Sequence, residues 1–154
     1  MKIRTLAIIA FVSSLSGVCL AQSSPAKATG ESGAPYNEGP VWTVSMIKTK
    51  TGLTDEYIKQ ITGTVKPVYD EAKKQKVILD YKILNGEASD RNDFNMMILV
   101  AFPNYAAFDH FRDNMDPITT KVMGSEEQRK DMAVKRLDIR EIIGTKTMRE
   151  ITLK

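Results

Sequence analysis

Histidine and cysteine are the side chains that most often act as bases, nucleophiles or metal ligands near neutral pH. The 154-residue chain has one of each, His110 and Cys19. A single histidine cannot form a two-histidine metal site, and Cys19 lies in a leader that we expect to be removed. The sequence also lacks a glycine-rich phosphate loop and a Gly-x-Ser-x-Gly elbow. We therefore expect no metal and no cofactor.

Carboxylate pairs are the next candidates for chemistry. Asp109 and Asp113 are spaced i,i+4, so a helix would place them on one face, where oxygen ligands can hold a hard cation. Arg112 lies close by and no loop with further ligands follows, so a solvated helix face explains the pair better. Glu126 and Glu127 fit the first turn of a helix, where negative charge is favourable. Neither pair predicts a metal site.

Residues 1–21 have the pattern of a signal peptide. Lys2 and Arg4 form a short basic start, residues 6–12 are an apolar run, and residues 19–21 place small side chains at a cleavage site. The apolar run is shorter than the roughly 20 residues that a membrane-spanning helix needs. We expect cleavage after this segment and a periplasmic or extracellular location, with no membrane contact beyond export.

Two other interpretations of this leader stay open. A membrane anchor is disfavoured because Ser13, Ser14 and Ser16 interrupt the apolar stretch. A lipid anchor on Cys19 is disfavoured by Val18, because bacterial lipoprotein signals have Gly, Ala or Ser directly before the cysteine.

Composition and charge describe the rest of the chain. Removal of residues 1–21 deletes two of the 22 basic residues and none of the 19 acidic ones, so the net charge falls from +3 to +1. With lysines spread over the chain, no basic stripe indicates nucleic-acid binding. A composition of 42% hydrophobic and 27% charged residues is that of a globular chain. Residues 22–40, rich in Ser, Pro, Gly and Ala, predict a flexible linker, and residues 41–154 predict one domain.

The domain contains four segments with the pattern of strands. Residues 41–50 and 94–102 are apolar on both alternating faces, which predicts strands that are covered on both sides. Residues 77–84 alternate between an apolar and a polar face, so one side of that strand meets water. Residues 139–153 form a last strand that is interrupted at Gly144.

Helices are predicted between these strands. The first spans residues 54–76 and bends at Pro67 on its solvent side. The second begins near Asn104, and a shorter third helix begins with a capping box of Ser125 and Gln128. The buried stripes are Ile58, Ile61, Val65, Val68, Tyr69 and Ala72 in the first helix and Phe108, Phe111 and Met115 in the second.

This order of elements predicts an α+β fold. With right-handed crossovers, it specifies the ferredoxin-like β-α-β-β-α-β plan, a four-stranded antiparallel sheet with helices on one side. Helices cover only one face of such a sheet, yet the strands at 41–50 and 94–102 are apolar on both faces. The other face therefore needs a partner sheet, which predicts a twofold homodimer.

The chain resembles the dimeric α/β-barrel superfamily, in which two ferredoxin-like sheets close a barrel between two subunits. The resemblance covers residues 41–154. It rests on the order of elements, the junction at residues 50–52 (Lys-Thr-Gly), the strand exit at 102–104 (Phe-Pro-Asn) and the strand start at 140–144. It extends to uncharacterised secreted bacterial members and, more distantly, to antibiotic-biosynthesis-type monooxygenases and stress-responsive barrels. The superfamily also includes haem-degrading monooxygenases, lactone isomerases and ligand-sensing domains, so the fold alone does not choose a function.

The haem-degrading members use an Asn on the first strand and a His late in the second helix. The resemblance places Ser45 and Phe111 at these positions, so neither residue type is retained. His110 is next to Phe111 but lies about 100° away around a helix, on its polar side. We therefore expect a surface histidine and no haem site.

The fold offers a small-molecule pocket between sheet and helices. We predict that Thr43, Ser45 and Tyr81 supply its polar groups and that Phe108 and Phe111 form its apolar wall. The first hypothesis is that a small apolar or aromatic molecule is bound without turnover. The alternative is a cofactor-independent monooxygenase or isomerase for a small aromatic substrate, to which the protein supplies a dry pocket and hydroxyl donors.

Overall fold

The computed structural model describes residues 33–154, so the predicted signal peptide and residues 22–32 of the predicted linker lie outside the described residues. None of the helices within residues 33–154 is long and apolar enough to cross a membrane. The elements are β1 (Tyr36–Thr49), α1 (Thr54–Gly63), α2 (Val65–Lys74), β2 (Asp80–Asn85), β3 (Met96–Phe102), the 3-10 helix η1 (Tyr105–Phe108), α3 (Phe111–Met123), α4 (Glu126–Leu137) and β4 (Arg140–Leu153).

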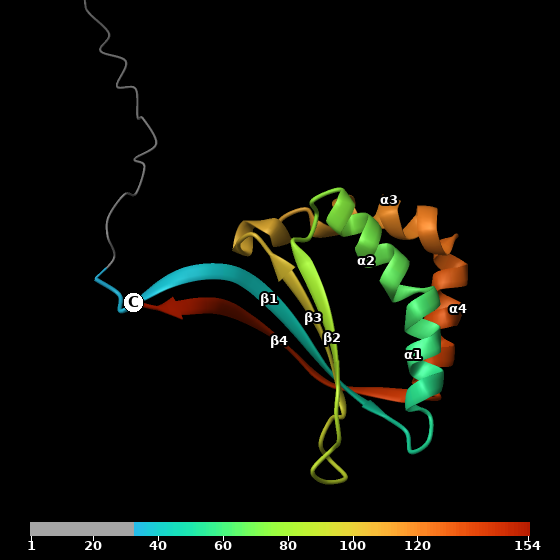
Figure 1. Ribbon diagram of the computed structural model, residues 1–154. Coiled ribbons are helices and arrows are strands. Elements are labelled where there is room, and N and C mark those ends of the chain that lie inside the picture. The colour runs from blue at the N-terminus through green and yellow to red at the C-terminus, as the bar shows by residue number, and fades with distance from the viewer. Residues whose placement is uncertain (1–32) are drawn as a thin grey trace, which may run out of the picture. The chain divides into compact units, whose positions relative to one another are not determined.

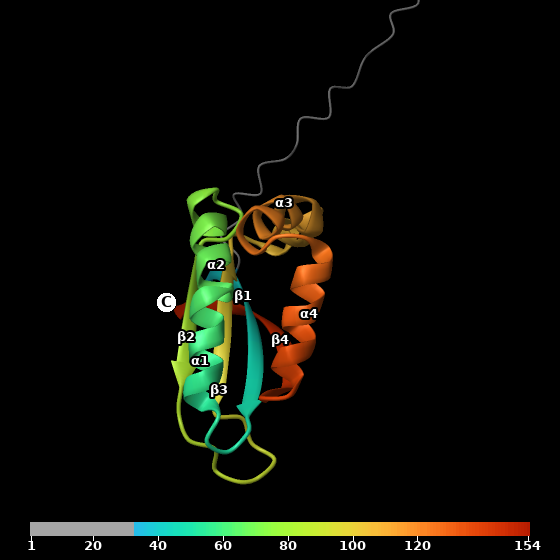
Figure 2. The same cartoon turned by 90° about the vertical axis from the view of Figure 1, so that its right-hand side faces the viewer.

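The four strands form one antiparallel sheet in the order β2-β3-β1-β4. All four helices lie on one side of this sheet (Figure 1). In Figure 2, α1 and α2 lie on one side of the helix layer and α3 and α4 on the other. The predicted ferredoxin-like fold is confirmed, with β1 and β3 at the centre of the sheet as their two apolar faces indicated.

The register between β1 and β3 decides which residues face the helices. Thr43 pairs with Val100 and Ser45 pairs with Ile98, and both partners belong to the core that packs under the helices. Alternation then places the intervening residues on the helix-free face. The helix-side core consists of Ile47, Tyr57, Ile61, Val68, Ala72, Ile78, Met96, Ile98, Val100, Phe102, Met115 and Ile118.

Several strand boundaries differ from the expected ones, most of all at the starts of β1, β2 and β3. β1 begins at Tyr36, five residues before the expected domain start at residue 41, because Tyr36 pairs with Leu153 at the far end of β4. The predicted linker is therefore wrong for its last five residues, which belong to the strand. β2 begins at Asp80 and β3 at Met96, in place of residues 77 and 94. The segment before β2 turns sharply, with Lys76 at a φ of 60°.

The first predicted helix is two helices, which corrects the expectation of one bent helix over residues 54–76. The chain leaves helical geometry at Thr64, where φ is −123° and ψ is −65°. Pro67 has no N–H to bond to the carbonyl of Gly63, four residues earlier, and Gly63 is itself a weak helix former. The break therefore falls one turn before the proline, and α2 starts in a new direction (Figure 1).

The second predicted helix is also interrupted. Asn104 caps the short η1, accepting a hydrogen bond from the backbone N–H of Ala107 at 3.2 Å. His110 then takes a left-handed conformation, with φ at 56°, and α3 starts after it. The capping box predicted for the last helix is present, because Ser125 and Gln128 each bond the other's backbone N–H.

Candidate functional site

A cavity of about 320 Å³ lies between α1, the start of α2 and the strands β2 and β3. We call it the α1–β2 pocket. Its floor is apolar and buried, with Ile61 and Met96 almost inaccessible to solvent. Its rim is polar. The lining residues are Ile58, Ile61, Thr62, Lys66, Tyr81, Ile83, Asn85 and Met96.

Local structure explains how these side chains converge. Tyr81, Ile83 and Asn85 alternate along β2, and they pair with Val100, Ile98 and Met96 of β3, so they project toward the helices. On α1, Ile58 and Ile61 are three residues apart and therefore share the face that covers this part of the sheet. The pocket is therefore the space between these side chains of α1 and those of β2.

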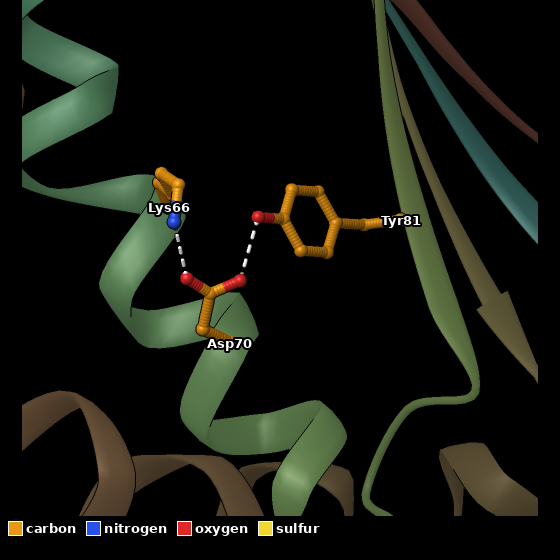
Figure 3. Close-up of polar contacts among 3 residues, drawn as sticks. All are labelled: Lys66, Asp70 and Tyr81. Atoms are coloured by element: carbon orange, nitrogen blue, oxygen red, sulfur yellow. Dashed lines mark hydrogen bonds and ion pairs between the residues drawn. The ribbon is translucent and has the colours of Figure 1, made fainter.

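A hydrogen-bonded chain of three side chains stands at the polar end of the pocket (Figure 3). The Tyr81 hydroxyl donates to Oδ1 of Asp70 at 2.7 Å, and Oδ2 of Asp70 accepts from Nζ of Lys66 at 2.6 Å. The Tyr81 ring also packs on Tyr69, with the ring centroids 5.3 Å apart. Helix α2 and strand β2 are therefore fixed to each other at the mouth of the pocket.

These hydrogen bonds influence the protonation of Tyr81 and Asp70. Burial and the hydrogen bond to Asp70 raise the pKa of Tyr81 to about 12, with smaller contributions from the charges of Asp70 and Asp80. The hydrogen bonds from Lys66 and Tyr81 lower the pKa of Asp70. At neutral pH, Tyr81 is therefore a phenol whose proton is directed at Asp70, so its oxygen can still accept a hydrogen bond.

The titration of Tyr81 is a direct prediction. Since its pKa in the folded state lies above the ordinary value of 10, the hydrogen bond to Asp70 stabilises the fold fully below pH 10 and is lost as pH rises toward 12. Asp70→Asn removes the charged acceptor, so the pKa of Tyr81 should fall toward 10. NMR titration of carbon-labelled tyrosine measures this. Asp80→Asn is the control, with a much smaller expected shift; an unchanged pKa in Asp70→Asn contradicts the assignment.

The predicted site residues do not all meet in this pocket. Tyr81 lines it. Thr43 and Ser45 face the helices from β1, partly exposed, but they are not among the lining residues. Phe108 and Phe111 pack on Phe102 at the other end of β3, with ring centroids 4.8 and 5.4 Å from it. The predicted aromatic residues thus form a separate cluster.

Sequence reasoning missed the helical side of the pocket. Ile58 and Ile61 were assigned to the core stripe, and Lys66 and Asp70 were not singled out. Their i,i+4 spacing is a signal for a helix-surface ion pair, which is what they form. The spacing does not reveal that Tyr81, eleven residues later, completes the chain.

His110 lies away from the pocket, as expected. Its side chain is 83% exposed and contacts Asp113 at 3.2 Å. Asp109 is exposed as well. Over residues 33–154, no group of three or more His, Cys, Asp or Glu side chains is placed to hold a metal ion.

Comparison with known proteins finds distant structural similarities. No family model and no curated protein matches the sequence. Similar solved structures include HapK from Hahella chejuensis, at 7% identity and a TM-score of 0.47 over 71% of this chain and 91% of that one. A dimeric ferredoxin-like protein from an uncultured marine organism has 14% identity and a TM-score of 0.43 over 75% and 97% of the two chains. A nipsnap family protein of unknown function from Agrobacterium tumefaciens has 14% identity and a TM-score of 0.39 over 75% and 90%.

Proposed function

We propose that the domain binds a small apolar or aromatic molecule in the α1–β2 pocket. The observation that carries the proposal is the lining itself, an apolar floor with a few polar side chains around it. Pockets of about 300 Å³ or more with this composition are typical of small-molecule sites. An aromatic ring fits against Ile58, Ile61 and Met96, while a polar substituent reaches Tyr81 or Lys66.

The chemistry of the lining favours binding without turnover. Tyr81 is protonated at neutral pH, and its proton is held by Asp70, so it does not serve as a general base. The pocket holds no carboxylate, histidine or cysteine among its lining residues. A reaction here would have to draw its reactivity from the substrate, and no feature of the pocket favours that alternative.

We further propose that two copies of the chain pair through the helix-free face. This face is defined by apolar residues from all four strands that alternate with the core: Trp42, Val44, Met46, Leu84, Met97, Leu99 and Met148. Leu84 is 46% exposed and Met148 is 56% exposed in the single chain. An apolar face on the two central strands is best explained by a second sheet against it.

The leader at residues 1–21 supports export, and we propose that the domain works in the periplasm or outside the cell. The N-terminal residue of the protein purified from a Gram-negative host tests this. Gln22 is expected there, and an intact Met1 or an acylated Cys19 contradicts it.

Calorimetric titration with naphthol, a small aromatic alcohol, tests the pocket. Ile58→Trp fills the cavity with a larger side chain, so naphthol should bind at least about tenfold more weakly. Val134→Trp is the matched control, because Val134 is exposed on α4, and its affinity should equal that of the parent. Equal naphthol affinity in Ile58→Trp and the parent, or no naphthol binding by the parent, contradicts the proposal.

A further inference from the structure

Two arginines have buried hydrogen-bond donors without acceptors. Arg136 lies in the last turn of α4, and Arg140 is the first residue of β4. Nε of Arg136 and both Nε and Nη1 of Arg140 are enclosed, and within residues 33–154 none of them has a hydrogen-bond partner. Buried N–H groups of a charged side chain are normally paired, so three orphaned donors in neighbouring guanidinium groups indicate an absent acceptor.

The groups around the arginines do not supply that acceptor. Nη1 of Arg136 donates to the Thr64 hydroxyl at 3.3 Å, and the Arg140 guanidinium lies 5.7 Å from the centroid of the Tyr57 ring. Burial and the nearby charge of Arg140 lower the pKa of Arg136, while burial raises the pKa of Tyr57. Two cations therefore stand beside a neutral phenol.

No carboxylate of the described part of the chain neutralises this pair. The ion pairs found over residues 33–154 involve neither Arg136 nor Arg140. Glu141 follows Arg140 in β4. Arg140 pairs with Thr49 and Glu141 pairs with Lys48, so the side chains of Arg140 and Glu141 leave opposite faces of the sheet. The positive charge at this place is uncompensated.

A cavity of about 610 Å³ opens beside Arg140, and its lining is charged and apolar. Besides Arg140, the lining residues are Lys48, Thr49, Lys50, Leu137, Glu141 and Ile142, so three cationic side chains face one carboxylate. Leu137 and Ile142 are 62% and 51% exposed, which is unusual for large hydrophobic residues next to a buried charge. The cavity therefore presents positive charge at one place and uncovered apolar surface at another.

We propose that Arg140, which lines this cavity, binds the carboxylate of an amphipathic organic acid whose apolar body lies against Leu137 and Ile142. A guanidinium group presents its N–H donors as a planar fork that matches a carboxylate. The uncompensated charge and the exposed apolar pair then have one common explanation. This site is separate from the α1–β2 pocket, because the two cavities share no lining residue.

Calorimetric titration of the full chain with octanoate, and with octanol as its uncharged counterpart, tests the proposal. Octanoate should bind and octanol should bind much more weakly. Arg140→Gln should weaken octanoate binding at least about tenfold, and Arg136→Gln, which removes a charge outside the lining of the cavity, should weaken it less. Arg129→Gln is the matched control on the same helix, because Arg129 bonds only Thr119 and Thr120 of α3, and it should leave octanoate binding unchanged.

Thermal unfolding without ligand separates binding from a structural role. Because the enclosed donors have no partners, Arg140→Gln should not lower the melting temperature of the free protein. Ile58→Trp should retain octanoate binding, so failure of the α1–β2 pocket and failure of this site are distinguishable. The proposal is overturned if octanoate does not bind, if octanol binds equally, or if the arginine variants lose folding or change the subunit number with octanoate affinity unaltered. The last result assigns the arginines to a subunit contact.

Discussion

Val44→Lys is expected to convert the protein from a dimer to a folded monomer. Val44 lies at the centre of the helix-free face, where it pairs with Leu99 of β3 and Lys146 of β4. A lysine there would place a second positive charge directly beside Lys146 between the two sheets, so the dimer should dissociate at least about a hundredfold more readily. Light scattering gives the subunit number. Val44 does not belong to the helix-side core, so the fold should persist.

Trp42 supplies a second readout for the same variant. It is the single tryptophan of the chain, and it lies on the helix-free face beside Met148. Its indole N–H donates a hydrogen bond to Oε2 of Glu150 at 2.7 Å. Its emission should shift to longer wavelength when the dimer dissociates and water reaches the ring. Ala133→Lys, which adds the same charge to an exposed position of α4, is the control and should stay dimeric. A parent protein that is monomeric at micromolar concentration contradicts the dimer.

Asn95→Ala is expected to lower the free energy of unfolding by about 2–3 kcal/mol. The Asn95 amide oxygen accepts from the Thr49 backbone N–H at 2.9 Å, and its amide nitrogen donates to the hydroxyls of Thr49 and Thr54 at 2.8 and 3.3 Å. This one side chain therefore joins the end of β1, the start of α1 and the start of β3. Alanine leaves the N–H of Thr49, which is 7% exposed, without a partner.

Urea denaturation measures the effect against a matched control. Asn92 lies three residues earlier in the exposed loop, and its side chain makes no hydrogen bond within the described residues. Asn92→Ala should change the free energy of unfolding by no more than about 0.5 kcal/mol. Equal stability of the two variants would show that Asn95 does not join these elements.

The sheet was predictable because its pattern is local. Met96, Ile98, Val100 and Phe102 alternate with Met97, Leu99 and Ala101, and a strand that is apolar on both faces has its place at the centre of a sheet. The capping box at Ser125 likewise needs only four residues. Element order and handedness then leave few topologies, and the ferredoxin-like one is found.

The errors come from interactions that a local pattern does not contain. The Tyr36 end of β1 is a strand only because Leu153, more than a hundred residues later, pairs with it. Apolar periodicity continues through Gly63 and Thr64, although the backbone breaks there because Pro67 removes a hydrogen-bond donor. Periodicity measures which side chains are buried, and it does not measure whether the helix axis is continuous.

The candidate sites show the same limit. Tyr81 was predicted as a pocket residue from its place on β2, and the structure lines the α1–β2 pocket with it. Its partner Asp70 was not, because the contact joins a helix and a strand. Arg136 and Arg140 looked like ordinary charges at a helix end and a strand start. Their donors are enclosed only in the folded chain.

Methyl NMR of the full chain during titration with naphthol tests the central claim, that a small apolar molecule binds in the α1–β2 pocket. The methyl groups of Ile58, Ile61, Ile83 and Met96 line that pocket, whereas those of Met115 and Ile118 lie in the core but do not line it. The methyl resonances of the first group should shift together and give one affinity. The methyl resonances of Met115 and Ile118 should not shift. Shifts that spare Ile58, Ile61, Ile83 and Met96, or no shifts at all, contradict the account.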